Sequence, residues 1–129
     1  MIRLFCPTIL LALVVGCGNG NVGLKGKVTF SDDGSPLTTG TVAFRKDGKV
    51  AYGTLKADGT YVVGFEKEAD GLPPGRYQVY ISGADKQLDN GSRELLIGRK
   101  YTDANKSGLV LDVDASTREY NIEVERYKK

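Results

Sequence analysis

Apolar and polar residues alternate along most of the chain after residue 23, and turn-forming residues interrupt this alternation at intervals of roughly ten positions. Alternation over ~4–8 residues is typical of a strand with one buried face. No window carries the spacing of a long amphipathic helix. The pattern predicts seven strands, over residues 24–30, 41–46, 50–55, 60–65, 76–82, 109–113 and 119–125. Short strands at this spacing predict an all-β sandwich or barrel.

The same alternation predicts which side chains form the core. Asp58-Gly59 and Asn90-Gly91 are strong hairpin signals, because glycine adopts positive φ without a steric penalty. In the third strand, Val50 and Tyr52 share one face. In the other six strands the inward side chains are expected to be Leu24, Val28, Phe30, Val42, Phe44, Tyr61, Val63, Phe65, Tyr77, Val79, Ile81, Leu109, Leu111, Val113, Tyr120, Ile122 and Val124.

The first residues have the features of an export signal. Arg3 supplies a positive charge, and an uncharged, mostly apolar stretch runs from Leu4 to Gly16. That stretch is shorter than the ~20 residues that a membrane-spanning helix needs, and it suits the apolar region of a signal peptide. We therefore expect residues 1–16 to be removed.

The end of this stretch, Leu13-Val14-Val15-Gly16-Cys17, resembles the lipobox of bacterial lipoproteins. The resemblance implies cleavage before Cys17 and acylation of its sulfur and its new amino group. Two or three acyl chains on this cysteine would hold the protein stably at a membrane. Residues 17–22 would then be the acylated cysteine and a flexible tether, and residues 23–129 the folded domain. Gly18 after the cysteine favours the outer membrane by the sorting rule of some Gram-negative lipoproteins. An ordinary signal peptide with an incidental cysteine is the alternative.

Composition narrows the possible chemistry. The 129 residues include 18 Lys and Arg, 16 Asp and Glu and no His, for a formal net charge of +2. This length suits one domain. Acidic and basic residues are interspersed, so the sequence lacks the clustered positive charge that is typical of nucleic-acid binding. A chain without His has no Ser-His-Asp triad and no His-containing metal site. We expect no enzyme activity, no cofactor and no nucleic-acid partner.

Seven segments of the chain match the motifs of a known domain family. They are Gly26-Lys27-Val28-Thr29-Phe30, Gly34-Ser35-Pro36-Leu37, Gly40-Thr41-Val42-Ala43-Phe44, Ala57-Asp58-Gly59-Thr60-Tyr61, Gly71-Leu72-Pro73-Pro74-Gly75-Arg76-Tyr77-Gln78-Val79, Ile97-Gly98-Arg99-Lys100-Tyr101-Thr102-Asp103 and Ser107-Gly108-Leu109. These segments resemble carboxypeptidase-regulatory-like domains and small planctomycete lipoproteins that contain this domain. The resemblance covers the whole mature chain and implies a seven-stranded transthyretin-like (prealbumin-like) β-sandwich. The hydroxyisourate hydrolases of this fold use His residues, which this chain lacks.

Clusters of polar residues offer little catalytic chemistry. The carboxylate pairs that share strand parity alternate with apolar or basic neighbours, as on a solvated strand face, and the oxygen-rich loops lack the spacing of an EF-hand. A weak calcium site in one of those loops and a Ser-Lys dyad both stay open. The pairs are Glu66 with Glu68, Glu123 with Glu125 and Asp112 with Asp114; the loops contain Asp32-Asp33, Asp85 with Asp89-Asn90, and Asp103 with Asn105.

The longest irregular segment, residues 83–100, is where we expect a binding site, because long loops on a rigid scaffold commonly carry function. Candidate ligand-binding residues are Tyr80, predicted to point outward, with Lys86, Arg93 and Arg99. Within this segment, residues 95–97 are expected to form a core plug or a short extra strand.

The leading hypothesis is a non-enzymatic, lipid-anchored module of the cell envelope, on the periplasmic side or at the cell surface, that interacts with an envelope protein or glycan. The alternative is a carbohydrate- or peptide-binding module that uses residues 83–100.

Overall fold

The computed structural model describes residues 21–65 and 70–128. These residues form nine strands and one 3-10 helix, so the all-β prediction is confirmed. The predicted leader, Cys17 and the pair Glu66 and Glu68 lie outside the described residues. The elements are β1 (Lys25–Phe30), β2 (Thr41–Lys46), β3 (Lys49–Thr54), β4 (Thr60–Val62), β5 (Gly75–Ser82), β6 (Asp85–Gln87), β7 (Arg93–Leu95), η1 (Arg99–Thr102), β8 (Leu109–Val113) and β9 (Ile122–Val124).

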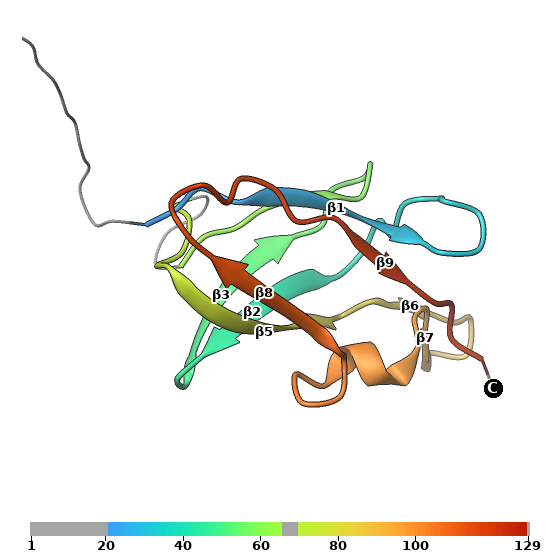
Figure 1. The fold of residues 1–129 in the computed structure, drawn as a ribbon. Helices are drawn as coiled ribbons and strands as arrows, with labels where there is room; N and C mark the ends of the chain where they lie inside the picture. Colours follow the sequence, from blue (N-terminus) through green and yellow to red (C-terminus); the bar gives the residue numbers. More distant parts are fainter. Residues whose placement is uncertain (1–20, 66–69, 129) are drawn as a thin grey trace, which may run out of the picture.

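Two sheets form a sandwich, with a three-stranded sheet in the order β4-β1-β9 and a four-stranded sheet in the order β3-β2-β5-β8. The pairing is antiparallel except between β1 and β9, which run parallel. Figure 1 shows β1 and β9 on one side of the molecule and β2, β5 and β8 on the other. A separate hairpin of β6 and β7 lies at one end of the sandwich.

The core lies between the two sheets and follows the predicted alternation. Along β5, for example, Tyr77, Val79 and Ile81 are buried, while their neighbours are partly or fully exposed. Nearly all the other predicted inward side chains are buried, and the remaining few, Phe65, Leu109, Leu111 and Tyr120, are partly buried against the core. In β3 the face that Val50 and Tyr52 share is the outer face of the sheet, and Tyr52 is 51% exposed.

The segment 83–100 is more regular than predicted, because it contains β6, β7 and the start of η1. The Asn90-Gly91 signal does make a turn, since Gly91 has φ of 87° and the N–H of Leu88 donates to the Ser92 carbonyl at 2.7 Å. The two strands lack alternating apolar residues, so the periodicity did not reveal them. The expected core plug is confirmed at Ile97, which is fully buried.

The end of the sandwich near residue 21 is closed by short contacts around the start of β5. Val22 and Leu72 exchange two backbone hydrogen bonds of 2.8 and 3.0 Å. The hydroxyl of Tyr77 donates to the Pro73 carbonyl at 2.6 Å, which holds the turn that leads into the strand. Among residues 21–65 and 70–128, no helix has the length and hydrophobicity to cross a membrane.

β1 approaches the segment before β9 unusually closely. The buried Tyr61 hydroxyl passes beside Gly26 and donates to the Tyr120 carbonyl, and the Lys27 N–H donates to the Asn121 side-chain oxygen at 3.1 Å. A Cβ on Gly26 would overlap the Tyr120 carbonyl oxygen and lie 2.6 Å from the Tyr61 hydroxyl. Burial raises the pKa of Tyr61, so the hydroxyl remains a donor at physiological pH.

We predict that Gly26→Ala destabilises the protein by roughly 3 kcal/mol, because backbone atoms on the facing segment have no room to move away from the added methyl group. The measurement is the free energy of unfolding from urea denaturation. Gly23→Ala is the matched control: nothing lies within 4 Å of its added Cβ, and the change should stay within about 0.5 kcal/mol. Equal effects of the two substitutions would contradict this account of the close approach.

Candidate functional site

The four predicted binding residues lie in three different places. Tyr80 lies on the outer face of the four-stranded sheet, Lys86 on one face of the β6–β7 hairpin, and Arg93 and Arg99 line a single surface depression. The structure therefore brings two of the four together. Tyr80 does not line this depression, which lies at the hairpin and the chain's C-terminal segment.

Tyr80 does point outward as predicted, but it is half-buried. Its register partner on β2 is Ala43, whose partner on β3 is Tyr52. Ala43 is fully buried although it faces out of the sandwich, which is consistent with the two flanking tyrosines covering this small side chain. Tyr52 is thus the more exposed aromatic residue of this face. The alternation of inward and outward positions along the strands did not by itself distinguish Tyr52 from Tyr80.

Lys86 is held by its own hairpin. It pairs in register with Glu94 across β6 and β7, and its ammonium lies 3.6 Å from the Glu94 carboxylate. An exposed cross-strand pair of this kind contributes a few tenths of a kcal/mol to about 1 kcal/mol of stability. Its charge is therefore already directed at a neighbouring carboxylate of the same hairpin.

The depression has a volume of about 430 Å³ and is formed by three segments far apart in the sequence. The β6–β7 hairpin makes one wall, η1 contributes its first residue, Arg99, and the C-terminal segment contributes Tyr127. We name it the hairpin depression. Its lining residues are Asp85, Leu88, Arg93, Glu94, Leu95, Arg99 and Tyr127.

Backbone pairing between residues 96–98 and 125–127 places Tyr127 beside Arg99. The N–H of Tyr127 donates to the Leu96 carbonyl at 3.1 Å, and the N–H of Gly98 donates to the Glu125 carbonyl at 2.9 Å. Between these two hydrogen bonds, Ile97 and Arg126 form an isolated antiparallel bridge. The sequence offered no signal for this pairing, because the apolar alternation of the last strand stops at Val124.

The two arginines of the hairpin depression differ in their partners. Arg93 is engaged by Asp85, with its Nη2 and Nε at 2.5 and 2.7 Å from the same carboxylate oxygen. Arg99 donates from Nη2 to the Tyr127 hydroxyl at 3.3 Å and lies 5.7 Å from the centre of that ring. Within the described part of the chain, Arg99 has no carboxylate within ion-pair distance. Most of its N–H donors therefore face solvent or a ligand.

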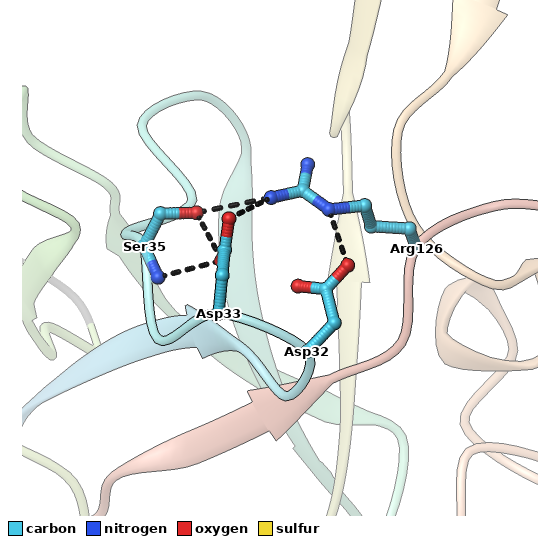
Figure 2. Close-up of polar contacts among 4 residues, drawn as sticks. All are labelled: Asp32, Asp33, Ser35 and Arg126. Carbon is cyan, nitrogen blue, oxygen red and sulfur yellow. Dashed lines mark hydrogen bonds and ion pairs between the residues drawn. The ribbon is translucent and has the colours of Figure 1, made fainter.

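A second polar cluster fastens the C-terminal segment to the loop after β1 (Figure 2). The Nε of Arg126 donates to Asp32 at 2.7 Å, and its Nη2 donates to Asp33 and to the Ser35 hydroxyl, both at 3.0 Å. The same guanidinium stacks 3.9 Å from the centre of the Phe30 ring. All these partners belong to the chain itself, so the cluster positions the segment that carries Tyr127.

The Asp33 carboxylate is stabilised mainly by its neighbour two residues on. The backbone N–H of Ser35, then its hydroxyl, and then the nearby Arg126 guanidinium lower the pKa of Asp33 to about 2. Asp32 and Asp33 were one of the oxygen-rich loops considered for calcium. Their oxygens face Arg126 and Ser35 instead of a shared cavity.

Several other carboxylates considered for chemistry also have partners. Asp112 pairs with Arg76 at 2.9 Å, and Asp114 accepts hydrogen bonds from Ser116 in its own turn. Asp103 accepts the N–H of Asn105 at 2.8 Å. Among residues 21–65 and 70–128, no group of three or more metal-binding side chains comes together.

A larger hollow, of about 880 Å³, lies over the outer face of the three-stranded sheet. Three lysines, Lys25, Lys27 and Lys56, and two glutamates, Glu119 and Glu123, line it. Its charges thus nearly cancel, and its walls are the outward side chains of β1, β4 and the segment around β9. The sequence pattern did not single out this surface, because alternating charged residues there are what any solvated strand face shows.

No protein-family model and no curated protein sequence matches this chain. Two solved structures of the major pilin subunit of Bacillus cereus, BcpA, are similar to it. A variant form gives a TM-score of 0.54 at 11% identity over 84% of this chain, and a second structure gives 0.50 at 11% over 82%. In both cases the match covers 30% of the pilin chain. At this identity the likeness shows a shared fold alone: the chain is a β-sandwich protein.

We predict that Asp33 makes stability depend on pH between about 4 and about 2. The pKa of its carboxyl is ordinarily 3.8 and falls to about 2 in the folded protein, so its contribution is complete well above pH 4 and is lost as the pH falls toward 2. The difference in unfolding free energy between wild type and Asp33→Asn should be constant above about pH 5 and should shrink below about pH 4.

The measurement is chemical denaturation at a series of pH values. Arg126→Gln is the companion variant: because Ser35 is the largest cause of the lowered pKa, this variant should keep most of the acid dependence. Parallel pH profiles of wild type and Asp33→Asn down to about pH 2 would rule out the role assigned to Asp33.

Proposed function

We propose that this protein is a lipid-anchored, extracytoplasmic β-sandwich module that acts without catalysis as an accessory or interaction protein of the cell envelope. The lipobox-like sequence before Cys17 supports the anchor, and a self-contained sandwich core supports a stable exported domain. The domain expected over residues 23–129 also includes Val22, which is already paired with Leu72, and it is of the carboxypeptidase-regulatory-like, transthyretin-like type that its motifs resemble. Its place is the periplasmic side or the cell surface, with Gly18 favouring the outer membrane.

The observation that carries this proposal is how soon the fold begins after Cys17. Val22 is already hydrogen-bonded to Leu72, so only residues 18–21 separate the anchor from the sandwich. An extended chain advances at most ~3.6 Å per residue, so Val22 stays within about 18 Å of Cys17. An acylated Cys17 thus holds the Val22 end of the domain against the membrane surface.

The β6–β7 hairpin, which forms one wall of the hairpin depression, lies at the other end of the sandwich (Figure 1). β5 runs from the Leu72 end to the start of β6, and its eight residues at ~3.3 Å each span about 25 Å. A domain anchored at Cys17 therefore presents the β6–β7 hairpin and the C-terminal segment away from the bilayer. Confinement to the surface raises the effective concentration of this end for partners in the envelope.

A second candidate function is a carbohydrate- or peptide-binding module that uses residues 83–100. The observation that favours it is that Arg93 and Arg99 of this segment line one depression together with Tyr127. Lys86 and Tyr80, which the same hypothesis included, lie outside it. Binding screens on a glycan array and a peptide array, with Arg99→Gln and Tyr80→Ala, test this function and discriminate between the two surfaces.

We predict that the wild-type protein, produced in a bacterial host fed a labelled fatty acid, incorporates the label and fractionates with membranes. Cys17→Ala should remove the label and release the protein, because the acylated thiol is absent. Cys6→Ala is the matched control and should label like wild type, since that residue belongs to the discarded leader. Equal labelling of wild type and Cys17→Ala would refute the anchor.

A further inference from the structure

We propose that the hairpin depression binds the C-terminal carboxylate of a peptide whose last side chain is apolar, with Arg99 and Tyr127 as the carboxylate-binding residues. The proposal rests on the second candidate function and names its ligand class. It follows from the charge of the depression, from the donors left over by the chain's own contacts, and from the apolar residues beside them.

The lining residues of the depression carry two positive and two negative charges, and Lys86, which pairs with Glu94 from outside the depression, brings the local total to one positive charge in excess. Of its two lining carboxylates, Asp85 is paired with Arg93 and Glu94 with Lys86. Arg99 is the remaining charge, and no described carboxylate lies within ion-pair distance of it. A single anionic group therefore complements this surface.

The donors of Arg99 and Tyr127 are arranged for one carboxylate. A guanidinium has five N–H donors in a planar fork, and the hydrogen bond from Arg99 to Tyr127 uses Nη2 alone. The Tyr127 hydroxyl accepts that bond, so its own proton remains available to an incoming oxygen. An N–H and an O–H donor thus lie 3.3 Å apart at their heavy atoms, a spacing that lets each donate to a different oxygen of the same carboxylate.

Two half-buried leucines in the depression favour a ligand whose remaining part is apolar. Leu88 and Leu95 line the same depression, and Leu95 also packs against the hydrophobic core. Placing a ligand side chain on these leucines removes apolar surface from water, which favours Leu, Ile, Val or Phe at the peptide terminus. A volume of about 430 Å³ is within the range of small-ligand sites, ~300–1,000 Å³.

The ligand class follows from combining these features. A sugar ring would require several hydrogen-bond partners for its hydroxyls, whereas the charged side chains here other than Arg99 already have partners. A lone inorganic anion would leave Leu88 and Leu95 in contact with water. A peptide terminus satisfies both the donors and the leucines.

The test is isothermal titration of the detergent-solubilised full-length protein with an acetylated Ala-Ala-Leu tripeptide that has a free carboxylate. We expect saturable binding that weakens at least about tenfold when the terminus is amidated, the loss typical of one charge-assisted hydrogen bond. Ala-Ala-Gly with a free carboxylate should bind about tenfold or more weakly, because it lacks the apolar side chain.

Variants assign the effect to the depression. Arg99→Gln should weaken binding about tenfold or more, Arg99→Lys should weaken it less, and Tyr127→Phe should weaken it several-fold because the phenolic donor is lost. Arg76→Gln is the matched control, since Arg76 is also an exposed arginine but lies near the start of β5, at the end of that strand away from β6, and its loss should leave affinity unchanged. Circular dichroism before each titration checks that every variant is folded.

Other outcomes overturn the proposal. Equal affinity for the amidated and free peptides, an unchanged affinity of Arg99→Gln, or no saturable binding would each exclude a carboxylate site here. Tighter binding of polygalacturonate that Arg99→Gln abolishes would assign the surface to an acidic polysaccharide instead. The anchor is tested separately: peptide binding with no fatty-acid label refutes only the anchor, and label without peptide binding refutes only this site.

Discussion

The close approach of the first strand to the last part of the chain is the constraint on which the rest of the structure depends. Parallel pairing of β1 with β9 closes the three-stranded sheet, and Gly26 leaves the space in which the Tyr61 hydroxyl reaches the Tyr120 carbonyl. The Tyr120 carbonyl is part-buried, so Tyr61 both fills the core and satisfies a backbone acceptor that has limited access to water. The position of everything after Tyr120 follows from this contact.

The hairpin depression inherits its geometry from that closure. Once β9 is aligned along β1, residues 125–127 continue alongside residues 96–98, and Arg126 is fixed by Asp32, Asp33 and the face of Phe30. These contacts leave Tyr127 on the side of Arg99. The Arg126 cluster therefore has a structural role close to the site, while Arg99, which has fewer partners, is the residue left to meet a ligand.

The two ends of the sandwich differ in what they can contact. The Val22 end lies a few residues after Cys17, so a lipid on that cysteine would orient the domain as well as retain it. The opposite end, about one strand length from Val22, holds the hairpin and the C-terminal segment. The similarity to a pilin subunit concerns the arrangement of strands and adds nothing about what either end binds.

Local patterns determined most of the strands of the two sheets, the core and several turns of this protein. Alternation along residues 77–81 identified the buried face of β5, and Asn90-Gly91 identified a turn, because both depend on residues close together in the sequence. The strands β6 and β7 were not predicted, since charged cross-strand pairs hold them rather than apolar alternation. Only the tertiary structure decided that Arg99 meets Tyr127 and that Tyr80 is half-buried on another face. Those contacts join residues far apart along the chain, and backbone pairing between distant segments has no signature in local periodicity.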